Sequence, residues 1–541
     1  MSSALGKVRR SFRRHGLAGT LQAASNRPGP TGLFYRSAHP GAFAERFQMI
    51  WCGPTGTSPE DLAEYPVADP ADETRACRAR GFSAGEPPAE ECSLSHLRRH
   101  LAAVARSSGW ILPAVLAPAA VLASVIGMNV IAPSLTVERI EQYAPRKDRA
   151  AWLAYLKRSE EQMKVDRATL AAELKPGETP PPPPAEGRGA PGQGMSLRHD
   201  DAYYGTAPAR HIADVIVSFQ TPAGGWSKNM GFSGALRLPG QPYAANNLNR
   251  FPDPNDFDKP RDPNWNYVGT LDNDATNTEL HFLARVQSHT PGKDGDAYRA
   301  SFIKGIHYLL AAQYPNGGFP QVYPLEGGYH DAITFNDNAV SESAETLSDV
   351  AEAKPGYDFV PADLRRQAAA AVAKALQCIL ASQIAIGGKK TIWPQQEDAL
   401  TLAPVSARNY EPGALAASES ADLLEYLMSL PNPSKELVAS IEAGLAWLKQ
   451  HEIYGYQYIG GWGTPEGRHL VAKEGAGPIW ARYYSIPAEK PIFGDRDKTL
   501  HDNVNDLSLE RRNGYAWYSS AEQQTIDDYA VWAKANGAAV P

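Results

Sequence analysis

The feature that most constrains the fold is a junction that recurs after predicted helices. Each junction closes a helix on Gln and continues through two glycines to an aromatic residue, with Gln220 leading to Trp226, Gln313 to Phe319 and Gln383 to Trp393. Such self-similarity is the signature of an internal repeat, although C-capping and packing alone explain each copy taken singly. The copies are 93 residues apart from Gln220 to Gln313 and 70 residues apart from Gln313 to Gln383. This irregular spacing fits a helical hairpin followed by a long loop.

From about Asp200 the apolar residues follow a period of 3.6, which indicates helix after helix. The predicted helices are 207–219, 274–289, 297–313, 339–353, 361–384, 413–430, 434–450 and 521–535. Stacked helical hairpins can curve into a ring in which one end collects the long loops. We therefore expect an all-α fold, a partial α/α toroid of the (α/α)3-barrel type, with its long functional loops at one end.

The N-terminal third divides into three stretches. Residues 1–95 lack a sustained period and are expected to be a disordered or non-native leader. Residues 96–133 place Arg98, Arg99 and Arg106 before an apolar run, which predicts a signal peptide or, alternatively, a signal anchor. Residues 134–194 read as a helical leader followed by a proline-rich linker, with five prolines at 180–184. The main domain is then expected over 195–541.

Charge and cysteine content narrow the class of protein. A net charge of −7 argues against nucleic-acid binding, which requires a basic face. The four cysteines form no CxxC spacing, and no HExxH motif occurs, so neither a zinc site nor a redox site is indicated. Cys378 lies on an Ala/Leu-rich helical stretch and is expected to be a buried structural thiol.

Two predicted loops carry carboxylates directly before helices. The first runs from Thr270 to Thr276 and contains Asp272, Asn273 and Asp274; the second, from Asp331 to Ala339, contains Asp337. An Asp at such a position can simply cap the helix, which is worth about 1 kcal/mol. Two Asp-Asn clusters at one end of a helical ring exceed what capping requires. Clustered carboxylate and amide oxygens suit a hard cation such as Ca²⁺, although the spacing matches no EF-hand.

Cationic residues accompany the same loops. Lys228 and Arg408 lie in glycine- and tyrosine-containing loops, and Arg482 and Arg496 belong to an aromatic-rich stretch from Pro478 to Tyr518. Singly, each is more often a surface ion pair than a ligand contact. The C-terminal stretch could likewise be a salt-bridged, aromatic-packed wrap. Together, however, planar guanidinium groups beside aromatic residues favour an anionic, ring-shaped ligand.

The loop motifs resemble those of the family 10 polysaccharide lyases, which are pectate lyases. The resemblance covers roughly residues 200–537 and touches every long loop. The matching segments are Gly224-Gly-Trp-Ser-Lys-Asn229, Thr270-Leu-Asp-Asn273, Gly317-Gly-Phe-Pro-Gln321, Ile333-Thr-Phe-Asn-Asp337, Ala407-Arg-Asn-Tyr-Glu411, Pro478-Ile-Trp-Ala-Arg482 and Arg511-Arg-Asn-Gly-Tyr515. One departure is Asp274, where the family often has a small residue.

The resemblance implies a pectate lyase that cleaves α-1,4-polygalacturonate by Ca²⁺-dependent β-elimination. Arg408 would be the base, with Arg496 as the fallback. Asp272, Asn273 and Asp337 would bind Ca²⁺, and Lys228, Arg482 and Arg496 would bind the uronate carboxylates. A secreted or periplasmic monomer is expected, with pectate as its partner, no nucleic acid, and no stable membrane partner after signal cleavage.

The implied chemistry is coherent except at the base. Removing the proton beside a uronate carboxylate places new negative charge next to existing charge, and cations relieve that charge as it develops. Arg normally stays protonated, with a pKa above about 12. We expect neighbouring cations to lower the pKa of Arg408, because like charges disfavour the charged form.

Two other functions use the same residues. An inverting glycoside hydrolase on a similar toroid would use Asp272 and Asp337 as acid and base about 6.5–9.5 Å apart. A non-catalytic pectin-binding protein would instead offer Trp226, Trp393 and Trp480 as stacking platforms. Unsaturated products and inhibition by chelators would identify a lyase.

Overall fold

The computed structural model describes residues 129, 132–187, 195–245, 262 and 265–538. The expectations for residues 1–95, and for most of the signal segment, lie outside the described residues. Among those described, no helix combines the length and apolarity needed to cross a membrane.

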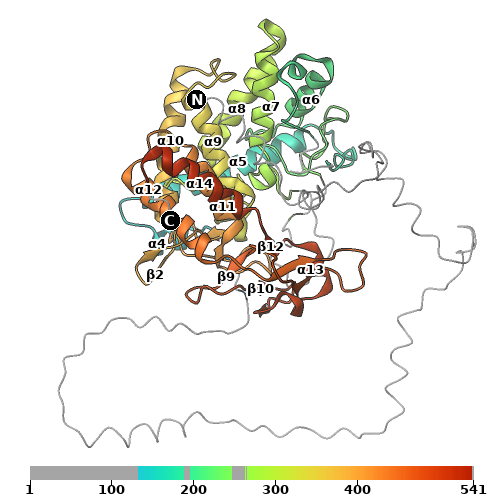
Figure 1. Ribbon diagram of the computed structural model, residues 1–541. Helices are drawn as coiled ribbons and strands as arrows, with labels where there is room; N and C mark the ends of the chain where they lie inside the picture. Colours follow the sequence, from blue (N-terminus) through green and yellow to red (C-terminus); the bar gives the residue numbers. More distant parts are fainter. Residues whose placement is uncertain (1–128, 130–131, 188–194, 246–261, 263–264, 539–541) are drawn as a thin grey trace, which may run out of the picture. The chain divides into compact units, whose positions relative to one another are not determined.

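The eight predicted helices all form, with ends shifted by at most a few residues (Figure 1). They are α6 (Ala207–Ser218), α7 (Asn277–Ser288), α8 (Asp296–Ala312), α9 (Ala339–Ala351), α10 (Ala362–Ser382), α11 (Ala417–Ser429), α12 (Lys435–Gln450) and α14 (Glu522–Asn536). Cys378 is buried within α10, and burial raises the pKa of its thiol, which confirms a structural role.

The helices contact one another in two rows. Helix α7 contacts α9, α9 contacts α11 and α11 contacts α14, whereas α6 contacts α8 and α8 contacts α10. Across the rows, α7 pairs with α8, α9 with α10 and α11 with α12. This alternation is what stacked hairpins require; the toroid itself stays a prediction.

The recurring glutamines join helices of the second row. Gln220 Nε2 donates to Ser301 O of α8, Gln313 Nε2 to Ala371 O of α10, and Gln383 Nε2 to Ser440 O of α12, each at 2.9 Å. The same amide groups also donate to carbonyls of their own glycine-containing loops, at 2.7–3.1 Å. The repeat therefore marks the points where one hairpin is fastened to the next.

Two of these junctions end on a buried tryptophan, and Trp480 makes the same kind of contact to α12. The indole nitrogens of Trp226, Trp393 and Trp480 donate at 2.7 Å to carbonyls of α6, α10 and α12. All three side chains are 0% exposed. The interpretation of these residues as sugar-stacking platforms is therefore wrong, because a platform must present its face to the ligand.

Strands are few and short in the described chain. Six two-stranded antiparallel pairs occur: β1 (Ile333–Thr334) with β4 (Gln396–Glu397), β2 (Ala385–Ile386) with β3 (Lys389–Lys390), β5 (Leu415–Ala416) with β9 (Tyr483–Tyr484), β6 (Tyr456–Ile459) with β7 (His469–Ala472), β8 (Trp480–Ala481) with β12 (Tyr518–Ser519), and β10 (Phe493–Gly494) with β11 (Leu500–His501). The pairs β1–β4 and β5–β9 join loops that are distant in the sequence and so fix the loop ends of the helices.

The helical leader forms as predicted but does not stand apart from the main domain. Its helices are α4 (Val137–Tyr143) and α5 (Arg149–Ala172). Trp152 and Tyr155 of α5 are buried in the same hydrophobic core as the other helices. The Tyr155 ring lies 4.8 Å from the ring of Tyr314, and its hydroxyl donates to Ala312 O at 2.9 Å.

The proline-rich segment also packs against the main domain instead of forming a free linker. Gly187 N donates to Asn229 O at 2.8 Å, and Gly231 N donates to Ala185 O at 3.1 Å. These bonds use the residues that flank the prolines, since proline itself has no N–H to donate. The expectation that a linker isolates residues 195–541 from the leader is therefore wrong for the described residues.

Candidate active site

Two aspartate loops lie side by side at the starts of α7 and α9. The short 3-10 helices η4 (Asp272–Asp274) and η7 (Asn336–Asn338) carry them and contact each other. Each loop has two successive left-handed residues, with φ of 54° and 58° at Asn273 and Asp274, and 46° and 61° at Asp337 and Asn338. A left-handed backbone costs a non-glycine residue about 1–2 kcal/mol. Such strain collects at functional sites.

The aspartates do not cap the helices that follow. The N-cap of α7 is Thr276 and that of α9 is Asn338, and neither cap uses an aspartate side chain. The capping alternative is therefore wrong for Asp272, Asp274 and Asp337.

The two loop carboxylates are close enough to form a hydrogen bond with each other. Asp272 is 2% exposed, accepts from Gln321 Nε2 at 2.9 Å and forms an ion pair with Lys228. Burial is the largest effect and raises the pKa of Asp272, but the charge and hydrogen bond of Lys228, with smaller contributions from Asp337 and Arg408, together lower the pKa below its usual value. Burial and the adjacent Asp272 raise the pKa of Asp337 to about 7. The pair thus holds uncompensated negative charge when both are ionised.

Lys228 is held over an aromatic ring. Its ammonium lies 3.6 Å from the centre of the Tyr267 ring. The Tyr267 hydroxyl is hydrogen-bonded to that of Tyr329 at 2.9 Å. The lysine charge is therefore fixed beside Asp272 by both an ion pair and a cation–π contact.

Arg482 lies between η7 and the first turn of α11. Its Nε donates to Glu419 Oε1 at 2.9 Å, and its Nη2 donates to Asn336 Oδ1 at 2.8 Å. Burial lowers the pKa of Arg482, but the pKa is raised overall, chiefly by the charge of Glu419 and by the nearby Tyr515. The guanidinium therefore stays charged. Arg482 also lowers the pKa of Asp337. It is thus a fixed cation beside the aspartate pair.

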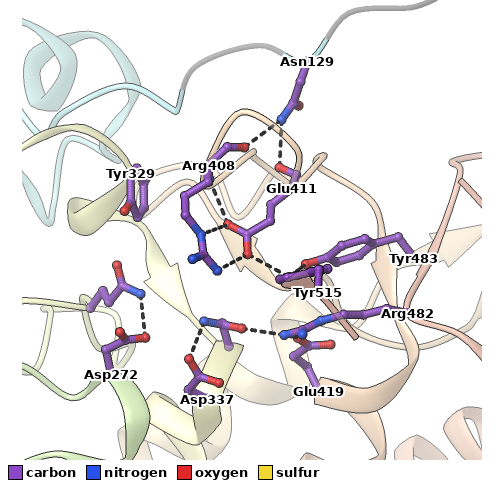
Figure 2. A network of polar contacts seen from close by, with 12 residues as sticks. Asn129, Asp272, Tyr329, Asp337, Arg408, Glu411, Glu419, Arg482, Tyr483 and Tyr515 are labelled. Atoms are coloured by element: carbon purple, nitrogen blue, oxygen red, sulfur yellow. Dashed lines mark hydrogen bonds and ion pairs between the residues drawn. The ribbon is translucent and has the colours of Figure 1, made fainter. Parts of the chain in front are cut away.

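Arg408 approaches the same aspartates from another loop. Its Nε and Nη2 donate to the two oxygens of Glu411 at 2.9 and 2.6 Å, and Tyr515 Oη donates to Glu411 at 2.7 Å (Figure 2). In the close-up, the side chains of Arg408, Asp272 and Asp337 point toward a common space. The charge of Arg408 contributes to the lowered pKa of Asp272.

The pKa of Arg408 moves opposite to expectation. Burial is the largest effect and lowers it, but the charge and hydrogen bond of Glu411, together with Tyr410 and Tyr515, raise the pKa above the usual value for arginine. Arg408 in turn overcomes the effect of burial on Glu411 and lowers its pKa to about 2. The expectation that neighbouring cations depress the pKa of Arg408 is wrong for this state, because its nearest charged partner is an anion.

Arg496 is not brought into this group. Its Nε donates to Glu510 at 2.8 Å, and its guanidinium lies 5.4 Å from the Tyr410 ring centre. Arg408 and Arg511 lie 5.0 and 4.1 Å from the same ring. Arg496 is therefore linked to Arg408 through Tyr410.

The stretch from Pro478 to Tyr518 is largely a packed wrap. Trp480, Tyr483, Tyr484 and Trp517 are at most 1% exposed, and Arg511 is 3% exposed. The structural alternative for this stretch is therefore confirmed for its aromatic residues, while Arg482 projects from it to the aspartates.

Three site residues escaped the sequence reasoning as functional groups. Glu411 stood inside the quoted Ala407–Glu411 motif, so its spacing to Arg408 was visible. Glu419 lies in α11 with no local signal of its partner. Asn129, whose amide contacts the Arg408 loop in Figure 2, lies in the predicted signal segment.

The donor set limits which metal the site could hold. Across the part of the chain that the structure describes, no three His, Cys, Asp or Glu side chains gather as a metal cluster. Asp272 and Asp337 supply carboxylates, and Asn273, whose side-chain nitrogen donates to Asn229 Oδ1 at 3.4 Å, lies next to Asp272 in the sequence. Such oxygen donors fit Ca²⁺, which takes six to eight oxygens including carbonyls and water. Their uncompensated charge gives a divalent cation a reason to bind.

Comparison with known families agrees with this geometry. A family model described as pectic acid lyase matches residues 220–526, a range that contains Lys228, both aspartates, Arg408 and Arg482. The chain belongs to this family.

Solved structures of relatives extend the match over the whole lyase fold. The family 10 polysaccharide lyase from Cellvibrio cellulosa is 30% identical to this lyase, with a TM-score of 0.51 over 62% of this chain and 95% of that one. An aspartate-to-alanine variant of the same enzyme, solved with trigalacturonic acid, matches with the same identity and TM-score over 96% of its length. A search of curated proteins gave no match to the lyase.

Proposed function

We propose that this pectic acid lyase cleaves α-1,4-polygalacturonate by Ca²⁺-assisted β-elimination, with Arg408 as the base. The observation that carries the proposal is the aspartate pair, Asp272 and Asp337, placed among the cations of Lys228, Arg408 and Arg482. The relative solved with trigalacturonic acid supports the choice of substrate.

The substrate carboxylates would bind to Lys228 and Arg482. Each cation is now paired with a protein carboxylate, Asp272 or Glu419. A uronate carboxylate can share or replace these partners, because both side chains keep unused donors around the charged group. Arg496, paired with Glu510, would contact a more distant sugar unit.

The metal would be held by Asp272, Asn273 and Asp337, with the remaining ligands from water and the substrate. When bound there, Ca²⁺ would neutralise the uronate carboxylate on which negative charge develops. Asp337 has a left-handed backbone, and the side-chain nitrogen of Asn336 donates to its Oδ2 at 3.0 Å, which would position this carboxylate before a ligand binds.

Arg408 would act through its third nitrogen. Among the described residues, Nε and Nη2 are bound by Glu411, and no hydrogen bond involves Nη1. In neutral form, Arg408 would take the C5 proton at Nη1. The C5–H electron pair would form the C4–C5 double bond as the C4–O bond breaks, and the leaving oxygen would gain a proton from water. Because Glu411 stabilises the charged arginine, the neutral form is reached only as pH rises.

The hydrolase alternative fits the aspartate geometry poorly. An inverting hydrolase separates its two carboxyl groups by about 6.5–9.5 Å to admit a water molecule. Asp272 and Asp337 are instead within hydrogen-bonding distance of each other. The pectin-binding alternative loses its stacking platforms, since the three tryptophans are buried.

The lyase fold and its location complete the proposal. The two rows of helix contacts support a partial α/α toroid with the loops of Asp272, Asp337 and Arg408 at one end. Because pectate is an extracellular polymer, we place the enzyme outside the cytoplasmic membrane, secreted or periplasmic, and expect a monomer.

The test is incubation of the full chain with polygalacturonate and Ca²⁺, followed by ultraviolet absorbance. We expect unsaturated chain ends to form, and their formation to stop when a chelator is added. Reducing ends without ultraviolet absorbance would identify a hydrolase, and binding without either product would identify a binding protein. Activity that persists in chelator would remove Ca²⁺ from the proposal but leave β-elimination in place.

A further inference from the structure

Asn129 fastens the loop that carries Arg408. Its side-chain nitrogen donates to Arg408 O at 3.2 Å, to Asn409 O at 3.1 Å and to Glu411 O at 2.9 Å (Figure 2). These carbonyls belong to one tight turn, in which Glu411 N also donates to Arg408 O at 2.9 Å. A single amide therefore contacts both ends of the turn that pairs Arg408 with Glu411.

The chemistry of these contacts requires an amide. A side-chain NH₂ has two hydrogens, so three carbonyl acceptors mean that one N–H is shared. A carboxylate of the same shape has no hydrogen to donate and would repel three carbonyl oxygens. Asn129 is 9% exposed, and burial makes an unmatched group at this position costly.

The same residue connects this turn to a second one. Asn129 N donates to Lys498 O at 2.8 Å, two residues after Arg496. The side-chain nitrogen of Asn409 donates to Arg496 O at 2.7 Å. Nearby, Ala132 is buried in a small apolar cluster with Tyr329 and Ala407, directly before Arg408. Asn129 thus contacts two arginine-bearing turns, which Asn409 also joins to each other.

We propose that Asn129 is a positioning residue, which orients the Arg408 guanidinium by fixing the turn from Arg408 to Glu411. This inference rests on the proposed function, in which Arg408 acts on the reacting sugar. Asn129 lies outside residues 220–526, the segment matched by the pectic acid lyase family. Asn129, which lies in the predicted signal segment 96–133, would therefore contribute to catalysis from outside the matched segment, and the active enzyme must retain it.

The proposal separates turnover from substrate binding. Lys228 and Arg482 are held by Asp272, Tyr267, Glu419 and Asn336, and none of these contacts involves Asn129. Loss of the amide should consequently displace Arg408 while the cations that bind substrate stay in place. Small displacements of a reacting group can cost about 100-fold in rate.

The experiment compares Asn129→Asp and Asn129→Ala with wild type in the full chain. We expect kcat to fall about 10- to 100-fold in Asn129→Asp and less in Asn129→Ala, with KM within about twofold of wild type. Amide hydrogen exchange of residues 407–411 should be faster in both variants, whereas exchange in α7 and α9 should not change.

Arg139→Gln is the matched control. Arg139 lies in the nearby helix α4 and forms an ion pair with Asp398 at 2.6 Å, and this ion pair does not involve the Arg408 turn. We expect its kcat to stay within about twofold of wild type. The proposal is overturned if both Asn129 variants keep wild-type kcat, if exchange at 407–411 is unchanged, or if Arg139→Gln loses kcat equally.

Arg408→Lys separates this inference from the proposed function. An inactive Arg408→Lys beside fully active Asn129 variants would sink the role of Asn129 and leave the base in place. An Arg408→Lys enzyme near wild-type activity would instead remove the base, whatever the Asn129 variants do. Faster exchange at 407–411 would then still show that Asn129 holds the turn, but not that it serves catalysis.

Discussion

The helix junctions and the aspartate loops occupy similar places in the chain, yet they are built in opposite ways. At the junctions, each glutamine amide and each indole N–H has a backbone acceptor, and the tryptophans are fully buried. The aspartate loops instead combine consecutive left-handed residues with two carboxylates that raise each other's energy. The junctions satisfy their polar groups within the protein, whereas the loops leave charge for something else to satisfy.

This difference shows which interactions serve stability and which serve function. A site held ready for an anionic, metal-assisted reaction costs folding free energy, which the surrounding scaffold must supply. Substitutions at the loops should therefore reduce activity without reducing stability. Substitutions at the junctions should do the reverse.

The largest expected effect is at Arg408. Arg408→Lys keeps a positive charge but loses the planar fork bound to Glu411 and moves the reacting nitrogen. We expect turnover to fall by about 10³-fold or more while pectate affinity changes little. Initial rates of ultraviolet-absorbing product and a pectate binding assay measure the two quantities. An Arg408→Lys enzyme within about tenfold of wild type would assign the base elsewhere.

The second effect is at Asp337, where activity and stability should move in opposite directions. Asp337→Asn should lower activity by about 100-fold or more, because it removes one of two carboxylates from the proposed metal site. The pKa of Asp337 is about 7 in the fold, so its ionisation costs stability as pH rises from the unfolded value toward 7.

The stability arm is measured by melting temperature in chelator. Above pH 7 the full cost is present in wild type, so Asp337→Asn should melt at a higher temperature at pH 8. At pH 4 the two proteins should melt alike, because Asp337 is then protonated in the fold. An Asp337→Asn variant that melts at a lower temperature than wild type at pH 8 would show that ionised Asp337 does not destabilise the fold.

A smaller effect concerns pH. Glu411→Gln removes the anion that raises the pKa of Arg408 and keeps an oxygen for Tyr515. If neutral Arg408 is the base, the rising limb of kcat against pH should move to lower pH by about 1–3 units. The expected loss of maximal rate is about tenfold, because the guanidinium is less firmly oriented. A limb that stays in place would indicate that Arg408 acts as a cation.

The smallest effect on activity is expected at the junctions. Gln313→Ala removes donors to Gly317 O and Ala371 O and should lower the free energy of unfolding by about 1–3 kcal/mol. Activity of the folded enzyme should stay within about twofold of wild type. Gln523→Ala is the matched control, since the side chain of Gln523 bonds Asp527 within α14, and its backbone bond to Ser520 O survives the substitution. Equal destabilisation of both variants would remove the special role of the junction.

Local features were predictable because their causes are local. The 3.6 period located the eight helices, and the family resemblance named the residues that meet around Asp272 and Asp337. The repeated glutamines were visible, although the sequence could not show that each one bonds the next hairpin. The two aspartate loops were recognisable from their Asp and Asn residues directly before predicted helices.

Three features could not be predicted from the sequence, because each depends on which residues come into contact in the fold. The ion pair with Glu411 reversed the expected pKa shift of Arg408, because a contact three residues away outweighs more distant cations. The apolar face of α5 was visible at Trp152 and Tyr155, but its partner Tyr314 lies in another hairpin. The proline content of residues 180–184 predicted a linker. The structure shows instead that the residues after these prolines form hydrogen bonds with the main domain.

The bracing of the Arg408 turn by Asn129 also has a consequence for how the chain matures during synthesis. Asn129 leaves the ribosome 279 residues before Arg408, which at about 5–20 residues per second is a delay of roughly 15–60 s. For part of that interval, Tyr155 of α5 has yet to receive its partner, because Ala312 is made 157 residues after it. Asn129 and α5 are thus made well before the residues they contact, and the Arg408 turn gains its brace only after Glu411 has been made.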